Sequence, residues 1–172
     1  MKLLHYISIS LTIIWMIIIF IFSSQTGEAS SNTSGGIVDT IIDIFITDYD
    51  SYNADTQQKI TDTITLIIRK GAHLTEYAIL GFLWLFTYAS STHFSCDIKK
   101  NKYNLIALSC ICSCLYAISD ELHQGFVADR SPAALDVLID TIGGLIGAFI
   151  AYLTISSKKL SCITKNAKSH IK

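Results

Sequence analysis

Proline and charged residues are both scarce in this chain of 172 residues. It contains one proline, and 16% of its residues are charged, against 51% that are hydrophobic. One proline is too few for a linker-rich protein, and a mean hydropathy of +0.46 is too high for an ordinary soluble domain. The length fits about one domain. The formal net charge of −1 argues neither for nor against nucleic acid, and we predict no nucleic-acid partner.

Several signatures of catalysis, metal binding and cross-linking are also absent. The sequence has no His-Glu-x-x-His pattern of zinc enzymes, no nucleophile elbow, no internal repeat and no low-complexity tract. Its five cysteines are an odd number and show no disulfide framework. Cys110, Cys112 and Cys114 alternate within an apolar run, so on a helix Cys112 points away from the other two. We interpret them as small packing residues.

Four apolar stretches are long enough to cross a bilayer as helices, which takes about 20 residues each. We predict spans at residues 3–22, 72–92, 103–119 and 133–155. The first stretch also resembles a signal peptide, since Lys2 precedes it, but a signal h-region is only about 7–15 residues long. The prediction is therefore an all-α integral membrane protein, with a membrane domain over 1–157 and a basic tail over 158–172.

The basic residues predict how these spans are oriented. Nine of the thirteen lysines and arginines precede the first span, separate the second from the third, or follow the fourth. Loops rich in lysine and arginine stay in the cytoplasm, so we expect a multi-pass protein with both termini cytoplasmic. Thirteen of the fourteen acidic residues then belong to the outer side or the outer halves of the helices.

The long outer segment, residues 23–69, is expected to form short amphipathic helices. Apolar residues recur at helical spacing over 37–45, which suits a helix lying at the membrane interface. A second helix is expected to begin near Asp55, capped by that residue, and to continue through Gly71 into the second span. Pro132 is expected at the first helical position of the fourth span.

Ionisable side chains gather at the outer end of the second predicted span. At 100° per residue, Arg69, His73 and Glu76 share one narrow helical face, flanked by Lys70 and Tyr77. An intrahelical ion pair that makes the buried end tolerable is one explanation. The other is a functional site, because ionisable groups in a membrane are costly and usually face a bundle interior or a wet cavity.

A pair of carboxylates marks the fourth span. Asp136 and Asp140 are four residues apart and share a face with Gly143 and Gly147. Small residues let another helix approach closely in a membrane, so this face is expected to be the packed one. Two carboxylates at such a position need protons, cations or a metal.

A third polar group follows the third predicted span. It contains Asp120, Glu121, His123 and Gln124, with Arg130 after them. A solvated loop is the simple explanation, but a histidine beside two carboxylates can carry or accept a proton near neutral pH.

The end of the first span contributes Ser24 and Gln25. Alone they say little, because serine and glutamine commonly end a span. The predicted topology nevertheless puts them at the same depth as the other three groups. Four segments far apart in the sequence are thus expected to converge on one outer pocket.

In this order, the four groups resemble the VanZ-like family of bacterial membrane proteins. The resemblance rests on Phe22, Ser23, Ser24, Gln25, Arg69, Lys70, His73, Glu76, Tyr77, Asp120, Glu121, His123, Gln124, Phe126, Arg130, Asp136, Asp140 and Gly143. It extends to Gly147, while the stretch 26–65 and the lysine-rich tail show no matching motif. The family is named for a membrane protein that lowers susceptibility to the glycopeptide antibiotic teicoplanin. The resemblance therefore implies a role in the bacterial cell envelope, with glycopeptide resistance as one form of it.

Two hypotheses about function remain open at this point. In the first, the protein binds an envelope lipid, a glycopeptide or a partner at the outer pocket. In the second, it is a membrane-embedded enzyme that uses acid–base or metal-assisted chemistry on a lipid-linked or phosphate-bearing cell-wall precursor. Two histidines with several carboxylates could also hold a divalent cation.

Candidate roles follow from the chemistry of each side chain. The candidate catalytic residues are His73, Glu76, Asp120, Glu121, His123, Asp136 and Asp140. The candidate substrate- or anion-binding residues are Ser24, Gln25, Arg69, Lys70, Tyr77, Gln124 and Arg130. Perturbed ionisable clusters occur in enzymes and in binding proteins alike, so the sequence does not choose between the two hypotheses.

Overall fold

The protein is all-helical, as the sequence predicts. A computed structural model describes residues 2–91, 101–128 and 130–169. The described residues contain no strand and form α1 (Lys2–Ser23), α2 (Gly27–Phe45), the short 3-10 helix η1 (Tyr49–Ser51), α3 (Ala54–Ser90), α4 (Lys102–Gln124) and α5 (Ala134–Ser169). Helix α5 continues without a break to Ser169, so the predicted basic tail begins as part of this helix.

Within the described parts of the chain, three helices are long and apolar enough to cross a membrane by length and composition. The segments are Leu3–Ser23 of α1, Lys102–Gln124 of α4 and Ala134–Ser156 of α5. Their exposed faces carry large apolar side chains such as Ile13 and Leu115, which suit contact with lipid. The predicted span at 72–92 falls on α3, apart from residue 92, which lies outside the described residues. Polar side chains occupy the beginning of that stretch and lower its hydropathy.

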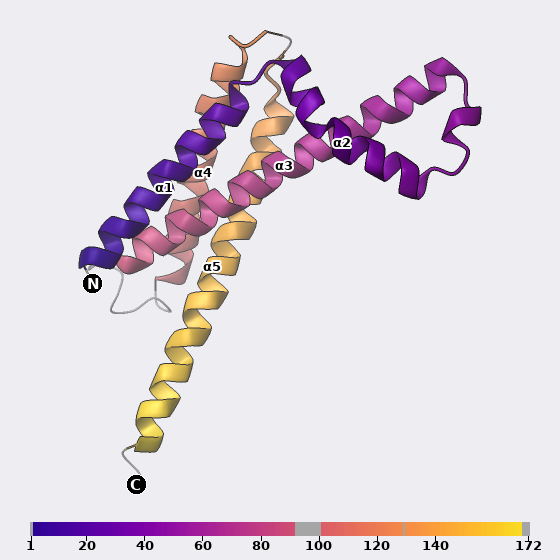
Figure 1. Cartoon of the computed structure of the whole chain (residues 1–172). Coiled ribbons are helices and arrows are strands. Elements are labelled where there is room, and N and C mark those ends of the chain that lie inside the picture. Colours follow the sequence, from indigo (N-terminus) through magenta and orange to yellow (C-terminus); the bar gives the residue numbers. More distant parts are fainter. Residues whose placement is uncertain (1, 92–100, 129, 170–172) are drawn as a thin grey trace.

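Helix α3 is the central element of the bundle. It contacts α1, α2, α4 and α5, and its most extensive contact is with α5 (Figure 1). Glycines make this close approach feasible. A Cβ atom added at Gly143 would overlap the carbonyl oxygen of Leu74, and one at Gly147 would overlap that of Ala78. The two backbones therefore lie in direct contact, as in other membrane helix pairs that meet through small residues.

Hydrogen bonds fix α1 against its neighbours. The indole Nε1 of Trp15 donates to the Glu76 carbonyl oxygen over 2.9 Å, and the Tyr116 hydroxyl donates to the Met16 carbonyl oxygen over 2.6 Å. In an apolar environment water does not compete for these donors and acceptors. The two hydrogen bonds therefore set the position of α1 along α3 and α4.

Helix α2 and the first part of α3 form an arm that leaves the bundle. Figure 1 shows the two crossing each other beside the bundle and diverging toward the tip, where η1 lies in the connection between them. Val38 and Ile42 of α2 are buried, and the Tyr49 hydroxyl lies 2.9 Å from Thr61 Oγ1. The expected amphipathic helix is therefore present, but it is longer than 37–45 and begins at Gly27.

Two expected helix boundaries are wrong in detail. The N-cap of α3 is Asn53, whose side chain accepts a hydrogen bond from the Thr56 backbone N–H, and not Asp55. Asp55 lies in the first turn and pairs with Lys59. Helix α5 begins at Ala134, two residues after Pro132. Asparagine and aspartate cap helices about equally well, so the sequence alone could not choose between them.

Helix α4 extends further than the span predicted at 103–119. It runs to Gln124, so the polar group that follows residue 119 forms the last turn of the helix and is not a solvated loop. The helical spacing places Asp120 and Gln124 one above the other, and Gln124 Nε2 donates to Asp120 Oδ2 over 3.2 Å. Both side chains are buried inside the bundle.

Candidate functional site

The predicted site residues meet at one end of the bundle. Here α1 and α4 end, α5 begins, and α3 passes through on its way from the arm (Figure 1). We call this region the polar end. All four polar groups identified in the sequence contribute side chains to the polar end.

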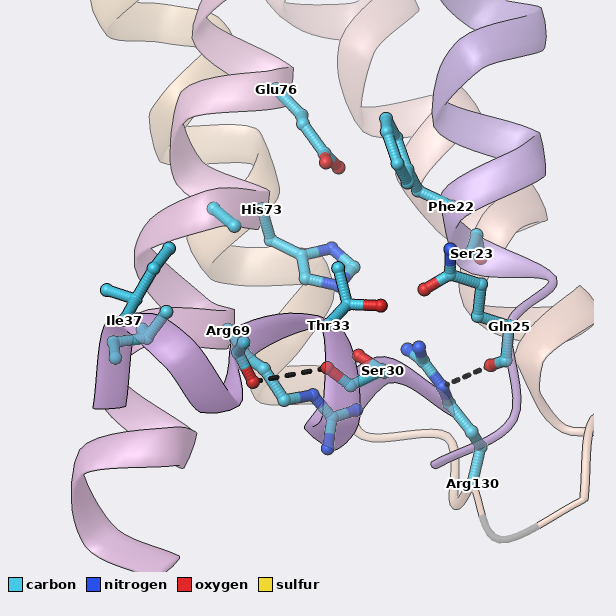
Figure 2. Close-up of a pocket in the computed structure, with 13 residues that line it drawn as sticks. Phe22, Ser23, Gln25, Ser30, Thr33, Ile37, Arg69, His73, Glu76 and Arg130 are labelled. Atoms are coloured by element: carbon cyan, nitrogen blue, oxygen red, sulfur yellow. Dashed lines mark hydrogen bonds between the residues drawn. The ribbon is translucent and has the colours of Figure 1, made fainter. Parts of the chain in front are cut away.

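A cavity of about 220 Å³ opens at the polar end between α1, α2 and α3. It is lined by Phe22, Ser23, Gln25, Ser30, Thr33, Ser34, Ile37, Ile68, Arg69, Ala72, His73, Glu76 and Arg130. Figure 2 shows Arg69, His73 and Glu76 following one another along α3, across the cavity from Phe22 and Gln25. The wall is thus apolar in part and strongly polar in part.

The contribution of α2 to this cavity was not predicted. Ser30, Thr33, Ser34 and Ile37 are spaced by three, one and three residues, which puts them on one helical face. That spacing is the signal in the sequence that could have identified them. It does not say which helix the face packs against, and this is decided by the contact between α2 and α3.

Two guanidinium groups lie in the cavity wall. Arg130 donates from Nε to the Gln25 carbonyl oxygen over 3.1 Å and from Nη1 to Gln124 Oε1 over 3.2 Å. Burial lowers the pKa of Arg130, and the nearby charge of Arg69 lowers it further, although a guanidinium remains charged at any physiological pH. Among the described residues, no carboxylate lies within ion-pair distance of either arginine.

A cluster of one histidine and two aspartates lies deeper, where α3, α4 and α5 meet. Each of His73, Asp120 and Asp140 offers a ligand atom, and these atoms lie within 4.8 Å of one another. Asp140 and Asp120 are 1% and 4% exposed. This is the group in the described structure that could hold a metal ion. A smaller cavity of about 80 Å³ reaches it and shares Arg69, His73 and Arg130 with the larger one.

Two of the candidate catalytic carboxylates have partners within the protein. Glu121 Oε1 accepts a hydrogen bond of 2.6 Å from the Ala133 backbone N–H, so this buried side chain satisfies an amide that α5 leaves free at its beginning. Asp136 forms an ion pair with Lys70 across the contact between α5 and α3. The predicted anion-binding lysine is therefore engaged within the protein.

His123 lies apart from the cluster that contains His73. Its Nε2 is 3.2 Å from Ser24 Oγ, and its ring stacks on Phe20 with a centroid separation of 4.6 Å. Neither His123 nor Ser24 lines the two cavities described above. The pair joins the end of α4 to the end of α1.

The remaining predicted residues lie in the interior. Tyr77 is fully buried, and its hydroxyl has no hydrogen-bond partner in the described structure. Gly143 and Gly147 lie in the backbone contact between α3 and α5. This contact holds the aspartate-bearing face of α5 against the histidine-bearing face of α3.

Comparison with known protein families agrees with the resemblance seen in the sequence. The model of the VanZ/LLP1 family matches residues 8–155, which include α3, α4, most of α1 and α5, and the whole polar end. Comparison with curated proteins and with solved structures gives no match. The chain belongs to the VanZ/LLP1 family.

Proposed function

We propose that this protein works in the bacterial cell envelope by binding the anionic headgroup of a membrane lipid, such as a phosphate-bearing, lipid-linked cell-wall precursor. The observation that carries the proposal is the placement of Arg69 and Arg130 in the wall of one cavity without a carboxylate partner among the described residues. Two positive charges that no carboxylate approaches within ion-pair distance, in a partly buried wall, favour an anion.

The shape and chemistry of the lining support a lipid as the source of that anion. Guanidinium groups present forked N–H donors that match phosphate oxygens. The Ser23 hydroxyl adds a buried polar atom without a partner in the described structure. Phe22, Ile37 and Ile68 provide apolar surface beside these polar groups. A ligand with a charged head and an apolar chain would satisfy both parts of the wall.

We therefore expect Arg69→Gln to weaken binding of an isoprenyl phosphate by about tenfold to a hundredfold. A hydrogen bond to a charged group contributes about 1.5–3 kcal/mol, which corresponds to that range of affinity. Farnesyl phosphate and farnesol would be titrated into the full chain in a neutral detergent, with binding followed by tryptophan fluorescence. Wild type should prefer the phosphate over the uncharged alcohol.

Lys59→Gln is the matched control for this loss of a positive charge. Lys59 lies on the arm, pairs with Asp55, and exposes 74% of its side chain, so its removal should leave the affinity unchanged. Equal affinities of wild type and Arg69→Gln, or equal binding of the phosphate and the alcohol, would refute the proposal. Stronger binding of teicoplanin than of either lipid would identify a glycopeptide as the ligand.

A catalytic function is the alternative, and one observation favours it. His73 and Glu76 can both carry a proton and line the same cavity as the two arginines. Acid–base chemistry on a bound phosphate ester would use this pairing. Release of inorganic phosphate from a bound isoprenyl phosphate would distinguish the enzyme from the binding protein.

The proposal needs the polar end to face outward, with both termini in the cytoplasm, four spans, and α3 crossing the membrane through its second half. We expect a cysteine placed at Ala128 to react with a membrane-impermeant maleimide on intact cells, and one placed at Asn101 to remain unlabelled. Both positions lie in connections between helices. The experiment requires a background without the native cysteines. The reverse labelling pattern would place the polar end in the cytoplasm.

A further inference from the structure

We propose that His73, Asp120 and Asp140 bind a divalent metal cation where α3, α4 and α5 meet. Each helix supplies one ligand, so the site exists only when the bundle is assembled. The inference does not rest on the lipid-binding function, because the ion would bind to the protein's own side chains alone.

The distances within the cluster leave polar atoms without partners. His73 Nδ1 and Asp140 Oδ1 are 3.7 Å apart, which is too long for a hydrogen bond. Both atoms are buried and have no other partner in the described structure. Asp120 uses Oδ2 to accept from Gln124, and its Oδ1 is likewise buried and unpartnered. Each of the three helices thus contributes a buried polar atom without a hydrogen-bond partner, from residues whose ligand atoms lie within 4.8 Å of one another.

The two carboxylates of the cluster also favour a bound cation. Two of the basic side chains nearby are engaged elsewhere: Lys70 pairs with Asp136, and Arg130 donates to Gln25 and Gln124. No lysine or arginine in the described ranges pairs with Asp120 or Asp140. Carboxylates this deeply buried are costly unless they are paired, protonated or bound to a metal. One divalent ion would balance two of them.

Tyr77 adds a further buried polar side chain close to the three ligands. Its side chain is fully buried, and its hydroxyl lacks a partner among the described residues. Tyr77 is also one helical turn after His73, on the same face of α3. A hydroxyl in this position can donate to a coordinating carboxylate, as partners of metal ligands commonly do.

The ligand types indicate which ions fit. One imidazole and two carboxylates suit Zn²⁺ or Mn²⁺, and no cysteine belongs to the group. Ligands about 2.1 Å from an ion in tetrahedral geometry are about 3.4 Å from each other. The 3.7 Å between His73 Nδ1 and Asp140 Oδ1 is close to this value, and small side-chain rotations would bring the two atoms to ligand distance. Three protein ligands leave at least one coordination position open.

Metal content of the full chain tests the proposal directly. Protein purified in detergent would be stripped with a chelator, exposed to MnCl₂, and passed through a desalting column before elemental analysis. Mn²⁺ is the chosen probe because cysteine thiolates prefer softer ions. We expect one ion per chain in wild type, and affinity at least about tenfold lower in His73→Gln and Asp140→Asn. Mn²⁺ should also raise the thermal unfolding temperature of wild type, but not that of His73→Gln or Asp140→Asn.

Two matched substitutions serve as controls. His123→Gln removes a histidine outside the cluster, and Asp62→Asn removes an exposed carboxylate on the arm, so both should bind Mn²⁺ as wild type does. If Asp140→Asn does not fold, the comparison of His73→Gln with His123→Gln decides alone. Absence of bound Mn²⁺ and of a thermal shift in wild type, or the same response in all variants, would overturn the proposal in favour of buried water or a shared proton.

Discussion

A Gly147→Ala variant is expected to lose about 3 kcal/mol or more of its free energy of unfolding. The added methyl group would overlap the Ala78 carbonyl oxygen on α3, which is backbone and cannot rotate away. Helix α5 must then move out as a whole, and the contact that brings Asp140 to His73 opens. Unfolding in detergent followed by circular dichroism would measure the loss.

Gly71→Ala is the matched control for this substitution. Gly71 lies inside α3 and has no atom within 4 Å of the position of an added Cβ. Alanine is favoured over glycine within a helix by about 1 kcal/mol, so this variant should become more stable. If both substitutions shift stability in the same direction, close packing of α3 on α5 is not the cause.

Arg130→Ala is expected to destabilise the polar end by about 3 kcal/mol, because two hydrogen bonds from a charged donor are lost. One hydrogen bond goes to the carbonyl oxygen of Gln25, which follows α1. The other goes to Gln124 Oε1 at the end of α4. The substitution would also leave Gln124 Oε1 without its donor inside the bundle. Unfolding in detergent followed by circular dichroism would measure the loss. The rate of backbone amide hydrogen exchange should rise first at the ends of α1 and α4.

Arg130→Lys separates charge from geometry in this effect. An ammonium keeps the charge but cannot present the fixed fork of donors, so an intermediate loss is expected. Lys59→Ala, which breaks an exposed pair on the arm, should cost less than about 1 kcal/mol. A loss in Arg130→Ala no larger than in Lys59→Ala would show that the arginine does not join α1 to α4.

Helical periodicity was sufficient to predict the side chains that share a face. Arg69, His73 and Glu76 were grouped by angle alone, and all three line one cavity. Asp136 and Asp140 were grouped in the same way, and both face α3. Such predictions succeed because they depend only on the local rotation per residue, which tertiary packing does not change.

The roles within the last turn of α4 could not be predicted in this way. Asp120, Glu121 and His123 were treated as one chemical group, yet each meets a different neighbour. Asp120 joins His73, Glu121 accepts from the beginning of α5, and His123 meets the end of α1. Which neighbour each one meets depends on how α4 is rotated against the other helices, and that is a property of the assembled bundle.

Helix α3 runs from the arm into the bundle without a break, passing the cavity at Arg69. Its stretch from Ala54 to Lys70 is about 25 Å long at 1.5 Å per residue. A tilt of about 10° at Arg69 would therefore carry the far tip, at Tyr49–Ser51, roughly 4 Å sideways. The length of the arm would thus enlarge a small change in the direction of α3 beside the cavity into a displacement of several ångströms at the tip.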